Sequence, residues 1–224
     1  MKARFRILKA CLALCLLFLY VGCTSDHSEV VGSKIRLELG DVSYFIPSDY
    51  FLTDLPVSMV STQGLDKNSG VSLKIPLTDL KLNSGATNET SSEIFVMMSD
   101  ITDVSRKSVI LPSGLAAWNG TGLFKERIIE FDNKVDLFRV YPRSGYPVFW
   151  EFFRSSPMSG GEAESEWVAG CWSSASSGAL HNASCDLLIN YMGVLARISL
   201  PGKYVKNADE IKLSFVEMLA GWSR

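Results

Sequence analysis

The chain has 224 residues, of which 22 are basic, 24 are acidic and 47% are hydrophobic. Four of the basic residues and none of the acidic ones precede Cys23, so the part that begins there has 18 basic and 24 acidic residues and a formal charge of −6. An acidic chain without a basic stripe interleaved with aromatic residues is a poor match for phosphate backbones, which excludes nucleic acid as the expected partner.

The first 22 residues have the composition of an export signal. An apolar run from Ala10 to Val21 follows four basic residues, Lys2, Arg4, Arg6 and Lys9. The run has about a dozen residues, fewer than the roughly 20 that a transmembrane helix requires. A basic segment, a short apolar segment and a small residue at its end are typical of a secretory signal peptide, so we expect residues 1–22 to be removed.

The sequence Leu-Tyr-Val-Gly-Cys, which ends at Cys23, resembles the bacterial lipobox. In that motif cleavage leaves cysteine as the first residue, with diacylglycerol on its sulfur and an acyl chain on its amine. Tyr20 departs from the pattern, which usually has leucine there. The resemblance implies that Cys23 is lipidated and that residues 23–32 form a tether. Thr24, in place of aspartate, implies the outer membrane; an ordinary cleaved signal with an incidental cysteine is the alternative.

Extended segments dominate residues 33–224, which we expect to form a single domain. Apolar residues alternate along most of these segments, a pattern typical of half-buried strands, and Gly40-Asp41 suits a tight hairpin turn. Two further hairpins are predicted, one around residues 132–134 and one around 191–193. In chain order the predicted strands are 34–39, 42–47, 71–77, 92–98, 127–131, 135–141, 148–153, 166–172, 185–190 and 194–200.

The C-terminus changes to a helical period. Asn207 and Glu210 are close to the capping pattern that begins a helix. The apolar residues that follow share one helical face: Ile211, Phe215, Met218, Leu219 and Trp222. The expected fold class is therefore α+β, with a mostly antiparallel β-sheet and a C-terminal amphipathic helix.

The cysteines support export. Cys11 and Cys15 leave with the signal and Cys23 carries lipid, so only Cys171 and Cys185 remain. An even pair in an oxidising compartment predicts a disulfide. It would close a loop of about 15 residues, which contributes roughly 3 kcal/mol in the chain-entropy model. Two buried free thiols are the alternative.

No motif for catalysis is visible. The two histidines, His27 and His181, lie in the tether and in a serine-rich loop, and neither G-x-S-x-G nor H-E-x-x-H occurs. A zinc site built from the two late cysteines and His181 would need free thiolates and a fourth ligand. Asp100 and Asp103 could act as acid and base, but acidic residues in a polar connection are more often solvated. We expect no enzyme activity, no metal site and no cofactor.

The stretch from Cys185 to Trp222 resembles the C-terminal part of a family of small envelope lipoproteins. It combines a cysteine-bearing strand, a turn at Gly193, a strand with Arg197, an LPGKY segment and a helix. Residues 43–51, SYFIPSDYF, are similar to the opening of the same proteins. These lipoproteins are encoded beside antibacterial effectors of the type VI secretion system. The resemblance implies an immunity protein that neutralises a toxin, often a phospholipase, in the periplasm.

An inhibitor needs a rigid surface and no catalytic group. We expect the loops 155–166 and 173–184 to contact the toxin, with Glu162, Glu164, Glu166 and His181 as candidate binding residues, although polar loops commonly contact only water. The alternative function is a structural or assembly lipoprotein of the cell envelope. A lipid-anchored hydrolase, the third class, would lose its activity on replacement of His181 by alanine.

Overall fold

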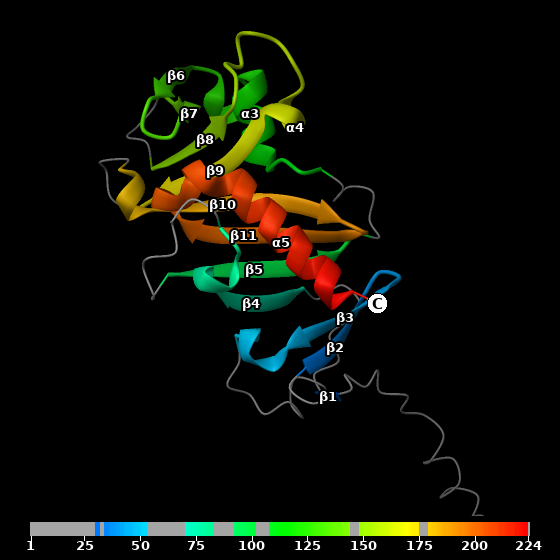
Figure 1. The fold of residues 1–224 in the computed structure, drawn as a ribbon. Helices are drawn as coiled ribbons and strands as arrows, with labels where there is room; N and C mark the ends of the chain where they lie inside the picture. Colours follow the sequence, from blue (N-terminus) through cyan, green and yellow to red (C-terminus); the bar gives the residue numbers. More distant parts are fainter. Residues whose placement is uncertain are drawn as a thin grey trace, which may run out of the picture.

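The computed structural model describes residues 30–31, 34–52, 70–82, 92–101, 108–143, 148–174 and 179–223. The signal, Cys23, His27 and Asp103 therefore lie outside the described residues. An antiparallel eight-stranded sheet forms the centre, in the order β4-β5-β11-β10-β9-β8-β7-β6 (Figure 1). Its strands are β4 (Val71–Pro76), β5 (Glu93–Asp100), β6 (Arg127–Asp132), β7 (Leu137–Pro142), β8 (Phe149–Phe153), β9 (Trp167–Ser173), β10 (Ala183–Tyr191) and β11 (Val194–Pro201).

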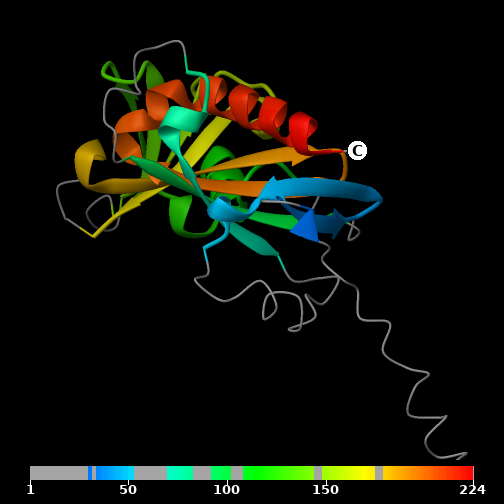
Figure 2. The ribbon, with the colours of Figure 1, turned by 60° about the horizontal axis from the view of Figure 1, so that its bottom comes forward.

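Helix α5 (Ala208–Trp222) lies across one face of the sheet, as Figures 1 and 2 show. Ile211, Phe215 and Leu219 on its buried side have no exposed surface, which is why the 3.6-residue period predicts the helix so well. They share a core with alternate residues of the strands, such as Leu187 and Ile189 of β10. The predicted α+β fold, with a mostly antiparallel sheet and a C-terminal helix, is confirmed.

Helix α3 (Pro112–Asn119) packs on β8 and β9 and belongs to a second, smaller core. Leu188, which lies between Leu187 and Ile189 in β10 and so points to the other face, packs into this core. The sequence analysis does not predict α3, whose last two residues are Trp118 and Asn119. Gly120 has φ 63° at the C-cap, the left-handed conformation that ends many helices.

A small sheet of β1 (Val30–Val31), β2 (Lys34–Leu39) and β3 (Val42–Pro47) closes the core near the end of α5. Tyr44 of β3 forms an antiparallel β-bridge with Ser223, and the ring centroids of Tyr50 and Trp222 lie 5.7 Å apart. The remaining elements are short: α4 (Ala163–Glu166), η1 (Ser48–Tyr50), η2 (Leu77–Asp79), η5 (Gly122–Phe124), η6 (Leu180–Asn182) and η7 (Gly202–Asn207).

The turn between β10 and β11 places a side chain where glycine or asparagine is preferred. Met192 has φ 47° and Gly193 has φ 83°, the pair of positive angles that a two-residue type I′ hairpin requires. Met192→Asn should therefore raise the free energy of unfolding by about 0.5–1 kcal/mol and the melting temperature by about 1–4 °C. Calorimetry of the two proteins measures this, and an unchanged or lower melting temperature would contradict it.

Candidate functional site

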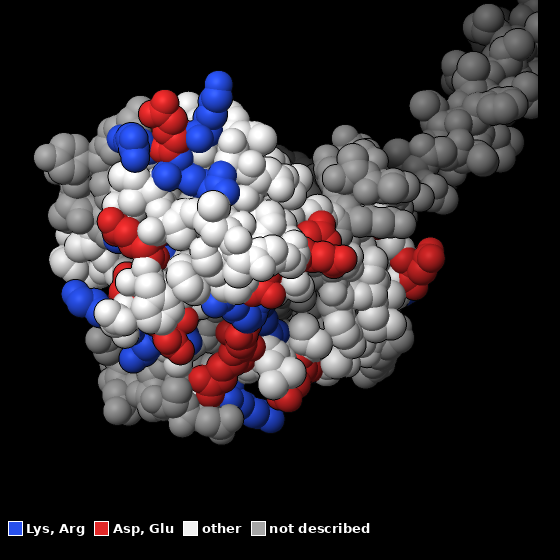
Figure 3. Space-filling model, turned by 90° about the horizontal axis from the view of Figure 1, so that it is seen from above, with Lys and Arg blue, Asp and Glu red and all other residues white. Residues whose placement is uncertain are grey.

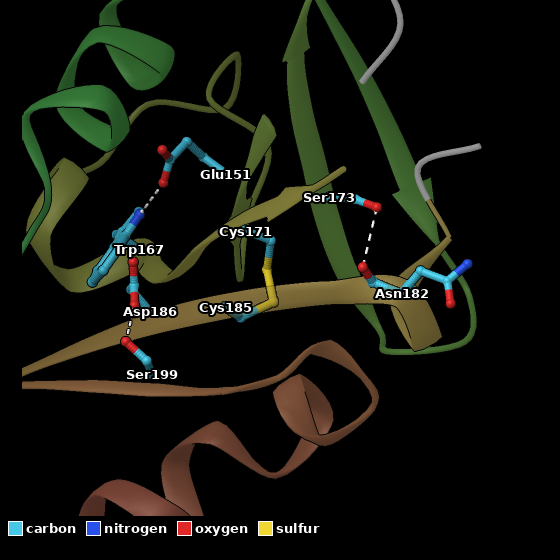
Figure 4. The surroundings of a disulfide bond; sticks show 8 residues. All are labelled: Glu151, Trp167, Cys171, Ser173, Asn182, Cys185, Asp186 and Ser199. Atoms are coloured by element: carbon cyan, nitrogen blue, oxygen red, sulfur yellow. Dashed lines mark hydrogen bonds between the residues drawn. A yellow bond between two sulfur atoms is a disulfide. The ribbon is translucent and has the colours of Figure 1, made fainter. Parts of the chain in front are cut away.

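Strands β9 and β10 are joined by the disulfide that the sequence predicts. Cys171 and Cys185 are directly opposite each other in the ladder and form a disulfide, with both residues buried under α5 (Figure 4). Beside it, the Ser173 hydroxyl donates a hydrogen bond to the Asn182 carbonyl at 3.2 Å. The crosslink therefore fixes the base of the serine-rich loop between the two strands.

Two buried carboxyl groups lie on the opposite face of these strands. Glu151 of β8 and Asp186 of β10 are both directly opposite Gly170 of β9 and are 2–3% exposed. A Cβ atom at Gly170 would lie 2.9 Å from Oε2 of Glu151, so glycine leaves room for this carboxyl group. Trp167 Nε1 donates to the same Oε2 at 2.7 Å (Figure 4).

The two carboxyl groups differ in their surroundings. Burial raises the pKa of Glu151 to about 7, while hydrogen bonds from Ser113 and Trp167 act in the opposite direction. Asp186 accepts hydrogen bonds at 2.5 Å from Arg197 Nη2 and from the Ser199 hydroxyl. Both carboxyl groups thus accept hydrogen bonds from side chains of the same chain. These bonds fit a role in holding the sheet and α3 together.

Strand β9 separates from β10 at a bulge. The β9–β10 ladder ends at Gly170 and Asp186, although β9 continues to pair with β8 as far as Trp167. The register shifts between Phe152 and Phe153, which leaves Val168 as an extra residue and turns Trp167 toward α3. The bulge opens the sheet between the start of β9 and the end of β10.

A cavity of about 410 Å³ lies at this opening, between α4 and the first turns of α5, and is called the α4–α5 cavity below. Its volume is within the range of about 300–1,000 Å³ that is common for ligand sites. Asn190 and three charged residues, Arg154, Glu164 and Lys212, line part of it. The rest of the lining is apolar: Val109, Trp167, Leu188, Ile189, Leu213 and Val216.

Lys212 brings a positive charge into this apolar site. Its Nζ donates to the Val168 carbonyl at 3.2 Å and lies 5.5 Å from the centre of the Trp167 ring. Burial lowers its pKa to about 8, and the charge of Asp209 offsets part of that effect, so the amine remains mostly protonated at neutral pH. Within the described ranges, the carboxylate of Asp209 pairs with Arg154 and no carboxylate forms an ion pair with Lys212.

The four candidate binding residues do not come together. Glu164 lines the α4–α5 cavity and accepts a hydrogen bond from the Ser108 hydroxyl at 2.7 Å. Glu162 is exposed just before α4, and Glu166 is half-buried at its end. His181 is exposed in η6, before β10 begins. Because β9 and β10 are antiparallel, the start of β9 beside Glu164 and the start of β10 beside His181 lie at opposite ends of the pair.

Apolar side chains are also exposed on the sheet face opposite α5. Phe95 and Met97 of β5 and Trp172 of β9 are each about half exposed. Figure 3, which views the molecule from the end with β6 and α3, shows acidic and basic side chains interspersed around a broad uncharged area. The ion pairs Lys74–Glu93 and Arg197–Asp186 neutralise two of the cations near Phe95 and Met97. This face therefore offers apolar contacts beside two cations that are already paired.

No helix among the described residues is long and apolar enough to span a membrane. Within the same residues, no group of three or more histidine, cysteine or acidic side chains is placed to hold a metal ion. The described residues thus form an antiparallel sheet with a covering helix, a buried disulfide and a largely apolar cavity beside α5.

Comparison with known proteins finds a similarity in structure but none in sequence. No known family matches the sequence, and neither does any curated protein. The fold is similar to that of Smlt3025, an immunity protein of the Stenotrophomonas maltophilia type IV secretion system, with a TM-score of 0.52. The match covers 91% of this chain and 100% of that one at 10% sequence identity. The chain thus has a fold like that of a secretion-system immunity protein.

Proposed function

We propose that this chain is a lipid-anchored envelope protein that neutralises an antibacterial toxin by binding it. The observation that carries the proposal is the likeness in fold to an immunity protein over the whole of that protein's length. The lipobox-like sequence at Cys23 adds a means of holding the chain at the membrane outside the cytoplasm. A type VI phospholipase is the toxin class that the sequence resemblance favours, and the periplasmic face of the outer membrane is the proposed location.

The structure supports binding over catalysis as the mode of action. The two buried carboxyl groups, Glu151 and Asp186, are hydrogen-bonded to side chains of the same chain. The exposed apolar side chains and the α4–α5 cavity are features that a protein partner can cover. A crosslinked, hydrogen-bonded sheet keeps the entropic cost of association low, as an inhibitor requires.

Protection of cells tests this function. A susceptible bacterium that directs a candidate toxin, chosen from the products of genes neighbouring this one, to its own periplasm should survive when it also makes the full chain. Survival should equal that of cells without the toxin, as judged by colony counts. Equal killing with and without the chain, when immunoblots show it in the envelope, would rule out the immunity role for that toxin.

Lipidation at Cys23 has its own expected result. Cys23→Ser removes the thioether site, so the protein should leave the membrane fraction, because three acyl chains hold a protein far more firmly than a single one. Ser25→Ala is the matched control and should stay in the membrane fraction. Fractionation followed by mass spectrometry of the N-terminal peptide measures both; an unacylated Cys23 in the wild-type protein would refute the anchor.

A further inference from the structure

In the part of the chain that the structure describes, no strand pairs with β10 beyond Asp186 on its β9 side, and Leu188, Ile189 and Asn190 line the α4–α5 cavity there. The Cα atoms of Cys171 and Cys185 are 4.0 Å apart, close to the roughly 4.5 Å of antiparallel pairs that exchange no backbone hydrogen bonds. The neighbouring residues, Ser184 and Asp186, therefore bond to β9. By the same alternation, the backbone N–H and C=O groups of Leu188 and Asn190 point to that side, where the β9 ladder has already ended.

Lys212 donates to a carbonyl group that an uninterrupted β9–β10 ladder would bond to β10. Continuing the β9–β10 register would pair Leu188 with Val168, whose carbonyl would then accept the Leu188 N–H. The bulge moves Val168 away, and its carbonyl accepts Lys212 Nζ instead. Among the described residues, this leaves a short strand edge at Leu188 and Asn190 beside an apolar cavity and a buried ammonium group.

These three features fit one kind of occupant. A strand edge recognises an extended backbone, an apolar cavity accepts a large apolar side chain, and an ammonium group without a carboxylate partner attracts one. Glu164, the acidic residue of the lining, is bonded to Ser108, and Asp209 is paired with Arg154. A carboxylate placed on Lys212 would therefore complete an ion pair that the described residues do not themselves form.

We propose that the α4–α5 cavity is where the toxin docks, through an extended segment that adds to the edge of β10, inserts a large apolar side chain and places a carboxylate on Lys212. This rests on the proposed function and names the contact through which it operates. Leu213, 62% exposed on the rim, covers the inserted side chain. The short edge limits the segment to about two or three paired residues.

The peptide acetyl-Val-Phe-Asp-Val-amide and its Asp→Asn analogue are defined probes of this site. In ¹H–¹⁵N NMR titrations of the purified chain, the acidic peptide should shift the amide signals of Leu188 and Asn190 and those around Leu213. The analogue should bind about tenfold more weakly, as expected for loss of one charge-assisted hydrogen bond. Lys212→Met should remove the difference between the two peptides, whereas Lys125→Met, at an exposed lysine elsewhere, should preserve it.

Other results would overturn the proposal: equal affinity of the two peptides, no saturable binding, or shifts confined to the Phe95–Trp172 face. Shifts of the same amides with protein concentration alone would assign the cavity to a second copy of the chain. Leu213→Asp should also abolish protection in cells, whereas Leu123→Asp, at another exposed leucine, should not. If both variants protect, the docking site is wrong and the immunity function stands; if the wild type fails to protect while the peptides bind, the function is wrong.

Discussion

Replacing both Cys171 and Cys185 by alanine is expected to lower the free energy of unfolding by about 3 kcal/mol. The crosslink closes a loop with a sequence separation of 14 residues, and its loss lets the unfolded chain explore more conformations. The two alanines also leave buried space between β9 and β10, so the structural loss adds to the entropic one. Urea unfolding of the chain from Thr24 onward measures the effect as a lower midpoint.

Reduction of the wild-type protein is the control, because the chain from Thr24 onward contains no cysteine other than Cys171 and Cys185. A reducing agent should lower the midpoint of the wild-type protein toward that of the double variant, which also carries the cost of the buried space, and should leave the variant unchanged. A wild-type protein whose midpoint ignores reductant, with two thiols titratable after denaturation, would show that the bridge does not form.

Stability should fall as the pH rises from about 4.5 to about 7, because of Glu151. Burial raises the pKa of this carboxyl group from 4.5 to about 7 in the folded state. Between those values the folded state keeps a proton that the unfolded state has released, so the slope of unfolding free energy against pH is negative. The full contribution is present below pH 4.5 and up to about 3 kcal/mol is lost by pH 7 and above.

Glu151→Gln keeps the size of the side chain and an oxygen for Trp167 Nε1, and it stays neutral at every pH. The variant should therefore flatten the dependence and exceed the wild type in stability above pH 7. Glu217→Gln, at an exposed position of α5, should keep the wild-type slope. Urea unfolding at several pH values compares the three proteins, and a wild-type slope that matches that of Glu151→Gln would contradict the assignment.

Local patterns predicted most of the fold. The alternation of buried and exposed residues in β5 and β11 matches the alternation of apolar residues in the sequence. The period of α5 was equally clear, because one of its faces meets the sheet along its whole length. The disulfide between Cys171 and Cys185 was predicted from the even number of cysteines that remain and from the expected export of the chain. These features depend on neighbours in sequence, or on a count, and need no knowledge of strand order.

Helix α3 was missed although its ends carry recognisable signals. Pro112 at the first turn and Gly120 at the C-cap are a typical pair for a short helix. The apolar residues of α3 are mostly small and its amphipathic pattern is weak, so the periodicity of the sequence did not predict a helix there. Gly114 packs against the Trp167 ring, where a Cβ atom would lie 2.6 Å from Nε1, so close packing explains the glycine in mid-helix.

Local sequence patterns could not predict the candidate site, because its residues come from different strands. Glu151, Gly170 and Asp186 become neighbours only because β8, β9 and β10 are adjacent in the sheet. The α4–α5 cavity depends on a one-residue bulge at Val168, in a segment that reads as an uninterrupted strand. Of the four residues chosen from loops, Glu164 lines this cavity, whereas His181 is at the other end of the strand pair.

The central claim is that this chain disables a toxin by occupying it. The direct measurement is to titrate the purified chain into a fixed amount of a purified candidate toxin, the one from which the chain protects cells, and follow the toxin's enzymatic activity. Activity should fall in a straight line and reach zero at a defined molar ratio, because each bound complex removes one active toxin. A toxin that keeps full activity in the presence of excess folded, disulfide-bonded chain would contradict the account.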